Sequence, residues 1–252
     1  MFSAVKLLTT RQVIVRIAIV IFVAELLIML FFTVIPPIEW RLQAMIDALL
    51  LTLLSAPAIY FGVIKPFVKA RDYALQQIHT LAHTDALTQI PNRLLILKHL
   101  EKLIAESIRH KDYGALLLLD LDGFKAINDT YGHEAGDSVL IEVGKRVSAN
   151  LRVEDDVGRF GGDEFIALIK RLGGDKQIAK VQAQSKATEL INHLNKPYDY
   201  EGNMLNFGAS IGIRMIGFEA LEAHDALHDA DTAMFQAKKI GKGNAVIFEQ
   251  AS

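Results

Sequence analysis

Gly161-Gly162-Asp163-Glu164-Phe165 is the stretch of sequence that decides the fold of this chain. Its glycines lie between two apolar runs, residues 157–160 and 165–169, a pattern that predicts a β-hairpin with its turn at the glycines. Because glycine has no Cβ, phosphate groups can approach such a turn closely, and the two acids offer the oxygen ligands that divalent cations prefer. An ordinary solvated hairpin can carry the same five residues. The rest of the chain must therefore decide between a metal site and a plain turn.

A third acid is expected close to the hairpin. Asp120 ends the apolar run of residues 115–119, which is typical of a buried strand with acids at its carboxyl end. If this strand lies beside the hairpin in one sheet, Asp120 joins Asp163 and Glu164. Such a cluster can hold two divalent ions against a triphosphate, where they polarise the α-phosphate and lower the pKa of an attacking hydroxyl.

Helical and strand-like patterns alternate from residue 85 to residue 248, about the usual length of one domain. Besides the hairpin, strands are expected at residues 115–119, 209–214 and 245–248. Helices are expected at residues 92–109, 124–128, 137–150, 176–194 and 225–240, the last closed by Gly241. This order predicts an α/β sandwich built on one sheet.

The N-terminal part is more apolar than a soluble domain. The 252 residues are 51% hydrophobic, and the mean hydropathy is +0.26. Residues 17–35 contain one charge, Glu25, and residues 48–64 contain none, so each run approaches the ~20 residues that cross a membrane. Transmembrane helices are thus predicted at about residues 14–35 and 44–64. The alternative for the first run is a signal peptide, but the run is longer than usual and ends in Pro36-Pro37, which favours an uncleaved anchor.

Basic residues set the expected orientation of these spans. They lie before the first span, once between the spans, and after the second: Lys6, Arg11 and Arg16; Arg41; Lys65, Lys69 and Arg71. This bias predicts that both termini are cytoplasmic. Because the connection between the spans is too short for a sensing domain, a stimulus would be a lipid, a small ligand among the helices or a partner. The roles of Glu25 and Asp47 stay open, and Pro57 should kink or weaken the second helix.

Residues 66–84 are expected to form a linker helix. Val68, Leu75, Ile78 and Ala82 have helical spacing, so this face is either a dimer seam or a surface that packs on its own domain. The absence of cysteine excludes disulfides and thiolate metal sites. A net charge of −2 does not indicate a basic surface that would bind nucleic acid.

Several separated motifs accompany the opening five residues. They are Asp85-Ala86-Leu87-Thr88 with Pro91-Asn92-Arg93, Asp120-Leu121-Asp122-Gly123-Phe124-Lys125, Asn128-Asp129, Gly132-His133, Gly136-Asp137, Arg159-Phe160, and Lys238 with Gly241-Lys242-Gly243-Asn244. Together they resemble the GGDEF, or diguanylate cyclase, family over residues 85 to about 248. The resemblance implies a palm-like, nucleotidyl cyclase-type central sheet flanked by helices. The expected organisation is a tail with two transmembrane helices (1–65), a linker helix (66–84) and a GGDEF catalytic domain (85–252).

The resemblance also implies roles for particular residues of these motifs. Metal ligands would be Asp120, the Leu121 carbonyl, Asp163 and Glu164, which would hold Mg²⁺ or Mn²⁺, two ions per GTP. Asp163 and Glu164 would be catalytic, and Asp163 would accept the proton. Guanine would be bound by Asn128 and Asp137, and His133 would contact substrate. The phosphates would lie near Gly161, Gly162, Phe124, Lys125, Lys238 and Lys242. Asp122 is either a metal neighbour or a cap for the following helix.

The implied reaction condenses two GTP into cyclic di-GMP and releases two pyrophosphates. Each domain would hold one GTP, so a homodimer is required, embedded in the bacterial inner membrane as a multi-pass protein with its catalytic domain in the cytoplasm. Arg152 and Asp155 have the spacing of the family's inhibitory product site; the alternative there is a surface salt bridge. Gln89 and Ile90 depart from the family pattern, which more often has Gly and Leu.

Two further interpretations compete with an active cyclase. One is a catalytically silent module that binds GTP or cyclic di-GMP and signals through dimerisation. The retention of Asp120, Asp163 and Glu164 favours the enzyme. The other is a relaxed purine specificity, which Asp137 disfavours because its carboxylate matches the N1 and N2 hydrogens of guanine.

Overall fold

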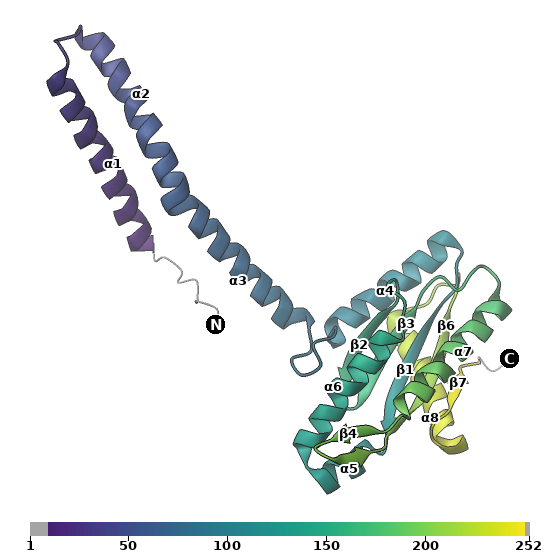
Figure 1. The fold of residues 1–252 in the computed structure, drawn as a ribbon. Coiled ribbons are helices and arrows are strands. Elements are labelled where there is room, and N and C mark those ends of the chain that lie inside the picture. The colour runs from purple at the N-terminus through teal and green to yellow at the C-terminus, as the bar shows by residue number, and fades with distance from the viewer. Residues whose placement is uncertain (1–9, 250–252) are drawn as a thin grey trace. The chain divides into compact units, whose positions relative to one another are not determined.

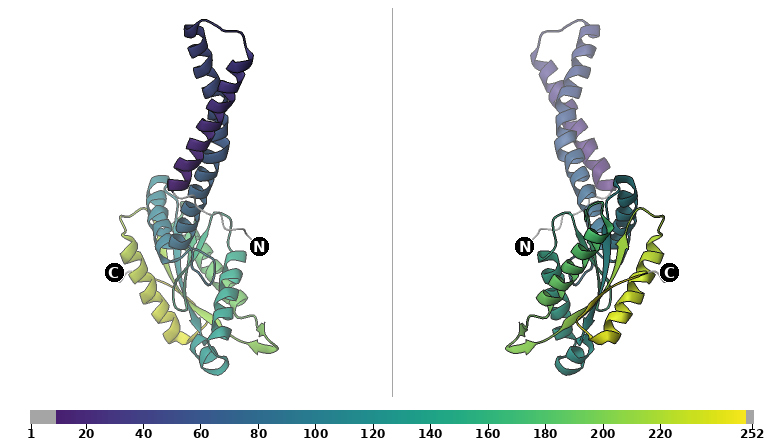
Figure 2. Two further views of the ribbon diagram at one scale, coloured as in Figure 1. Left: turned by 90° about the vertical axis from the view of Figure 1, so that its left-hand side faces the viewer. Right: turned by 90° about the vertical axis from the view of Figure 1, so that its right-hand side faces the viewer.

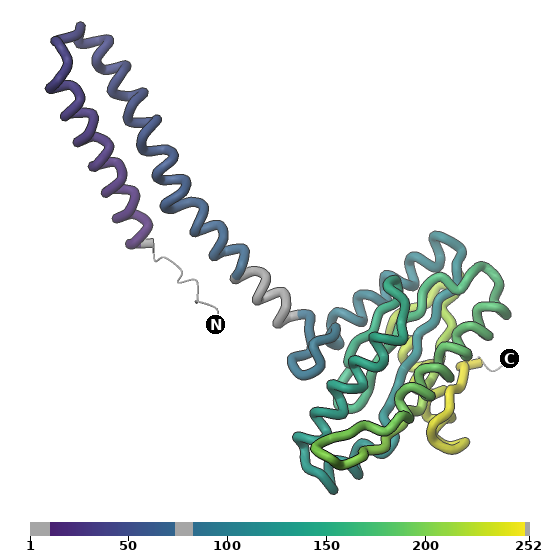
Figure 3. Tube along the Cα trace, in the orientation of Figure 1, coloured from purple at the N-terminus to yellow at the C-terminus, as the bar shows by residue number. Residues whose placement is uncertain are grey.

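The computed structural model describes residues 10–249, apart from the side chains of residues 10 and 74–82 (Figure 3). The chain divides into two compact units, Met1–Thr80 and Leu81–Ser252. Lys6 lies outside the described residues. The same is true of the side chains of Leu75, Ile78 and Ala82, so the expected dimer seam stays a prediction.

Two antiparallel helices, α1 (Thr10–Val34) and α2 (Trp40–Ile59), form the first unit (Figure 1). Both are long and apolar enough to cross a membrane, which is weak support for membrane anchoring. A cavity of about 480 Å³ lies between them, and its lining includes Glu25, Asp47 and Trp40. The two carboxylates therefore face one space from opposite helices.

The end of α2 departs from regular geometry after Pro57. The α-helix gives way to a π-helix, η1 (Tyr60–Ile64), before α3 (Lys65–His83) begins. Proline has no N–H to donate and its ring crowds the carbonyl four residues earlier, so the hydrogen-bond ladder is disturbed locally. These effects act on the turn before Pro57, whereas the π-helix follows it, so the expected kink or weakening at Pro57 stays a prediction.

A five-stranded mixed sheet in the order β2-β3-β1-β6-β7 forms the centre of the second unit (Figure 1). Its strands are β1 (Gly114–Asp122), β2 (Asp156–Gly161), β3 (Glu164–Ile169), β6 (Gly208–Ile216) and β7 (Ala245–Ile247). Only the β6–β7 pair is parallel among these described strands. Helices α4 (Arg93–His110), α5 (Phe124–Tyr131), α6 (His133–Ala149), α7 (Lys176–Leu194) and α8 (Ala223–Gly241) surround the sheet.

The central strand explains why helices cover both faces. Leu117 and Leu119 belong to a core with α6 and α7, whereas Leu116 and Leu118 belong to a core with α4 and α8. A continuous apolar strand buries side chains on both faces, so each face needs a helical layer (Figure 2). The predicted α/β sandwich on one sheet is confirmed.

Two local features differ from expectation. Helix α6 begins at His133, four residues earlier than expected, because Gly132 takes a φ of 86° and separates it from α5 without a longer loop. A small hairpin of β4 (Tyr198–Tyr200) and β5 (Asn203–Leu205) was not predicted. It turns at Glu201 and Gly202, both with positive φ, the geometry of a tight hairpin turn.

Candidate functional site

The three acids of the predicted cluster meet at one end of the sheet. Strands β1 and β3 are antiparallel, and Asp120 lies directly opposite Glu164 in their register. The Leu121 amide donates to the Asp163 carbonyl at 3.3 Å, so the β2–β3 turn lies against the end of β1. The expectation that the hairpin lies beside the buried strand is confirmed.

The charges of this cluster are only partly balanced. Burial raises the pKa of Asp120, opposed by Lys238, whose Nζ lies 2.8 Å from Asp120 Oδ2, and reinforced by Asp163. Burial also raises the pKa of Glu164, and the nearby charges of Asp120 and Asp163 raise it further. The acidic site is therefore a place where ionised carboxylates repel one another.

A divalent cation fits this chemistry. Within the part of the chain that the structure describes, no three Asp, Glu, His or Cys side chains are already gathered into a ligand cage. Yet the donors available from Asp120, Leu121, Asp163 and Glu164 are all oxygen atoms, which Mg²⁺ and Mn²⁺ prefer. A cation would relieve the repulsion that raises the pKa values of Asp120 and Glu164.

Arg159 holds the other side of the same turn. Its Nε and Nη2 donate to the Gly162 carbonyl at 3.0 and 2.8 Å, and its Nη1 donates to Asp85 Oδ1 at 3.2 Å. Gly162 has a φ of 54°, so the turn uses the left-handed backbone that glycine tolerates. The sequence showed Arg159 only as part of a motif, and its bonds to the turn become visible only in the structure.

Asp85 in turn closes the segment before α4. Its Oδ1 accepts hydrogen bonds from Thr88 N at 2.9 Å and Thr88 Oγ1 at 2.7 Å. Burial acts to raise the pKa of Asp85, but these bonds and the Arg159 charge outweigh it and lower the pKa. Gln89 follows with a φ of 60°, which explains why this position favours glycine.

The two residues expected to bind guanine come from neighbouring helices. Asn128 lies on α5 and Asp137 near the start of α6. The Asn128 side chain lies over Gly136, where any Cβ would overlap its Oδ1 atom. The structure thus brings Asn128 beside the residue that precedes Asp137, while Asp137 and His133 are exposed.

The residues expected near the phosphates lie at two helix ends. Phe124 and Lys125 begin α5 after Gly123, which has a φ of 83°. Lys238 lies in the last turn of α8, and Lys242 directly follows that helix. Lys238 also has a partner that was not predicted, because it is ion-paired with Asp120.

Asp122 does not cap α5, which corrects one of its two expected roles. The N-cap of α5 is Gly123, and no side chain caps the helix there. The Asp122 carboxylate instead accepts from Ser210 Oγ at 2.9 Å and from Gly243 N at 3.0 Å. It fastens the segment beside Lys242 to the end of β1.

Arg152 and Asp155 form a turn at the start of β2. The Asp155 carboxylate is buried and accepts from the backbone amides of Arg152 at 3.1 Å and Lys170 at 2.9 Å. The Arg152 side chain is exposed, and among the described residues it forms no ion pair with Asp155. The two residues are thus joined through the Arg152 backbone amide and not through its guanidinium.

Known proteins resemble this chain both in sequence and in structure. Residues 82–244 match the family model described as "Diguanylate cyclase, GGDEF domain". The bifunctional diguanylate cyclase/cyclic di-GMP phosphodiesterase MucR of Pseudomonas aeruginosa is 38% identical over 178 residues, which are 71% of this chain and 25% of MucR. Diguanylate cyclase TpbB of the same species is 34% identical over 169 residues, 67% of this chain and 38% of TpbB. The chain thus spans well under half the length of these curated relatives.

Solved structures support the fold. The GGDEF domain of TpbB from P. aeruginosa superposes with a TM-score of 0.62 at 34% identity, covering 66% of this chain and 95% of that chain. The coiled coil and GGDEF domain of DgcB from Caulobacter crescentus, solved in complex with c-di-GMP, gives a TM-score of 0.66 at 22% identity, covering 78% of this chain and 99% of that chain. With most of the second unit matched in sequence and in fold, the chain belongs to the GGDEF domain family of diguanylate cyclases.

Proposed function

We propose that this protein is a diguanylate cyclase that condenses two GTP into cyclic di-GMP and two pyrophosphates. The observation that carries the proposal is the pairing of Asp120 with Glu164 beside the β2–β3 turn, where burial and the charges of neighbouring carboxylates raise the pKa of each. Diguanylate cyclase activity is also part of the names of MucR and TpbB.

The acidic site would hold two Mg²⁺ or Mn²⁺ ions per GTP through Asp120, the Leu121 carbonyl, Asp163 and Glu164. When bound, such ions polarise the α-phosphate and lower the pKa of the attacking 3′ hydroxyl. Asp163 would accept the proton of that hydroxyl. Gly161 and Gly162 leave room for phosphate oxygens, because a Cβ at either position meets open space.

The guanine base would lie between α5 and α6. Asn128 and Asp137 offer an amide and a carboxylate, and the carboxylate can accept both the N1 and N2 hydrogens of guanine. His133 would contact the substrate from the first turn of α6. Phe124, Lys125, Lys238 and Lys242 would surround the triphosphate.

Turnover would require a homodimer, because each domain supplies one GTP to a reaction that joins two. We propose that residues 1–65 form a tail and two helices in the bacterial inner membrane, that residues 66–84 link them to the GGDEF domain (85–252), and that this domain lies in the cytoplasm. Membrane anchoring would raise the local concentration of the second domain. The apolar helices α1 and α2 support this arrangement.

The direct test is to incubate the full-length protein, in nanodiscs, with GTP and Mg²⁺ and to detect cyclic di-GMP by mass spectrometry. Product that disappears without the metal would support the cyclase. Tight GTP or cyclic di-GMP binding without any product would instead support the silent binding module.

Product inhibition at Arg152 and Asp155 is a separate part of the proposal. Arg152→Ala removes an exposed guanidinium that can grip a guanine edge or a phosphate, and it leaves the amide that bonds to Asp155 in place. We expect inhibition by added cyclic di-GMP to weaken by about tenfold or more, measured as the concentration that halves the initial rate. Arg109→Ala, an exposed arginine on α4, is the control. Equal inhibition of both variants would count against this site.

A further inference from the structure

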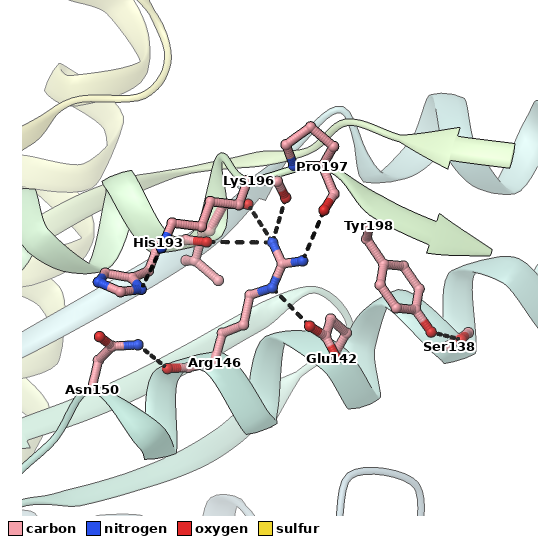
Figure 4. Close-up of polar contacts among 9 residues, drawn as sticks. Ser138, Glu142, Arg146, Asn150, His193, Lys196, Pro197 and Tyr198 are labelled. Carbon is pink, nitrogen blue, oxygen red and sulfur yellow. Dashed lines mark hydrogen bonds and ion pairs between the residues drawn. The ribbon is translucent and has the colours of Figure 1, made fainter.

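Helix α6 is tied at two points to the chain segment that joins α7 to β4 (Figure 4). Near its start, Ser138 Oγ lies 2.7 Å from Tyr198 Oη. Near its end, Arg146 reaches the same segment. The bond between Ser138 and Tyr198 is the tie that lies next to Asp137.

Arg146 gathers the backbone directly before Tyr198. Its Nε donates to Glu142 Oε1 at 2.8 Å, and its remaining nitrogens donate to the carbonyls of His193 (3.3 Å), Leu194 (3.1 Å), Lys196 and Pro197 (3.3 Å). These carbonyls belong to the C-terminal end of α7 and the residues after it, where the helix dipole favours a cation. The planar guanidinium can serve several acceptors at once, which a lysine ammonium does less well.

This anchor fixes where Tyr198 enters β4. The β4–β5 hairpin pairs three residues with three, and two short strands alone are marginally stable in water. Arg146 holds the residues up to Pro197, so Tyr198 starts from a set position. The Tyr198 hydroxyl can then restrain the position of Ser138 on α6.

At the start of α6, the bond between Ser138 and Tyr198 adds to the core packing of Ala135 and Val139, which are buried. The N-cap of this helix is Gly132, with no side-chain hydrogen bond to cap the first turn. Ser138 directly follows Asp137, so a hydrogen bond to Ser138 limits rotation of the helix about its own axis. Such rotation would move the exposed Asp137 carboxylate relative to a bound base.

We propose that Tyr198 is a positioning residue for purine specificity: through Ser138 it sets the Asp137 carboxylate against the N1 and N2 hydrogens of guanine, while Arg146 holds the segment that carries it. The inference rests on the proposed function, because it assigns guanine to Asp137. It adds Tyr198, which is far from the motifs in the sequence and lies on a hairpin that contains none of them.

The test compares GTP with ITP, since inosine lacks the N2 amino group that guanine offers to Asp137. Tyr198→Phe removes only the hydroxyl. We expect the ratio of kcat/KM for GTP to that for ITP to fall about tenfold, mainly through KM for GTP. A purely structural loss would reduce the active fraction and lower both values equally, leaving the ratio unchanged.

Matched variants sharpen the comparison. Tyr200→Phe removes the same group two residues further along β4, where the hydroxyl makes no hydrogen bond among the described residues, and should keep the wild-type ratio. Ser138→Ala should reproduce Tyr198→Phe, and the double variant should lose nothing more. Arg146→Lys should fall between wild type and Tyr198→Phe.

A GTP to ITP ratio that stays at the wild-type value in both Tyr198→Phe and Ser138→Ala would overturn the inference. A wild-type protein without turnover would count against the proposed function instead. In that case the same ratio is taken from the two dissociation constants, measured by calorimetry with GTP and with ITP.

Discussion

The acids on the two sides of the β2–β3 turn have pKa shifts of opposite sign. We call the side of Arg159 and Asp85 the anchored side, and the side of Asp120, Asp163 and Glu164 the acidic side. Asp85, on the anchored side, is surrounded by donors from Thr88 and Arg159, and its pKa is lowered despite burial. Burial raises the pKa of Glu164, on the acidic side, and the charges of Asp120 and Asp163 raise it further. The anchored side therefore gains stability from a charge, whereas the acidic side keeps charges that cost stability.

The strong hydrogen bonds of this turn therefore lie on the side of Arg159 and Asp85. Hydrogen bonds from Arg159 hold the turn carbonyl of Gly162, so the turn keeps its shape while the acids beside it stay poorly neutralised. Carboxylates that are only partly neutralised, beside a turn of fixed shape, are suited to a cation that arrives with a substrate. Four substitutions test this contrast.

Asp163→Asn should have the largest effect, on the acidic side. It removes the proposed metal ligand and proton acceptor, so we expect cyclic di-GMP formation to fall at least ~10³-fold. The far-ultraviolet circular dichroism should stay unchanged, because the side chain is not in the core. Asp225→Asn, at an exposed acid on α8, is the control. A near-normal rate in Asp163→Asn would show that the acidic side is misassigned.

Arg159→Ala should have the next largest effect, on the anchored side. It removes the donors to Gly162 and Asp85, and we expect a loss of about 1–3 kcal/mol in the free energy of unfolding together with a drop of roughly 10- to 100-fold in turnover. Urea denaturation and initial rates measure the two effects. Arg159→Lys should recover only part of the lost stability and only part of the lost turnover. If turnover persists at the wild-type level, the turn holds its shape without this anchor.

Asp85→Asn should destabilise the protein by about 1 kcal/mol at neutral pH, because Arg159 and Thr88 lose a charged acceptor. The lowered pKa of Asp85 means that its contribution is present above the ordinary pKa and lost as the pH falls through the lowered one. Between those pH values, stability should thus decline less on acidification in Asp85→Asn than in wild type. Equal acid sensitivity in thermal melts would argue against the bonding described for Asp85.

Glu164→Gln should have the smallest effect on stability and the opposite sign. The raised pKa of Glu164 means that its stabilising contribution is full below the ordinary pKa and is lost as the pH rises through the raised one. The metal-free variant should therefore melt a few degrees higher than wild type at neutral pH, on the order of 2 °C, with little difference at low pH. A lower melting temperature at neutral pH would mean that the charge is satisfied after all.

Much of this arrangement could be predicted from local sequence. The apolar run before Asp120 and the glycines before Asp163 each determine their own element, so strands and hairpin were found in place. The start of α6 was missed because it depends on the backbone angle of Gly132. The bonds of Arg159 to Asp85 and of Lys238 to Asp120 join residues 74 and 118 positions apart, and nothing local in the sequence encodes such distances.

The ion pair between Lys238 and Asp120 makes two binding events depend on each other. Lys238 is proposed to contact phosphate and Asp120 to bind metal, so each ligand draws away one partner of the pair. Nucleotide that engages Lys238 frees Asp120 for the cation, and the cation frees Lys238 for the nucleotide. GTP and metal should thus bind cooperatively, each raising the affinity for the other by the same factor.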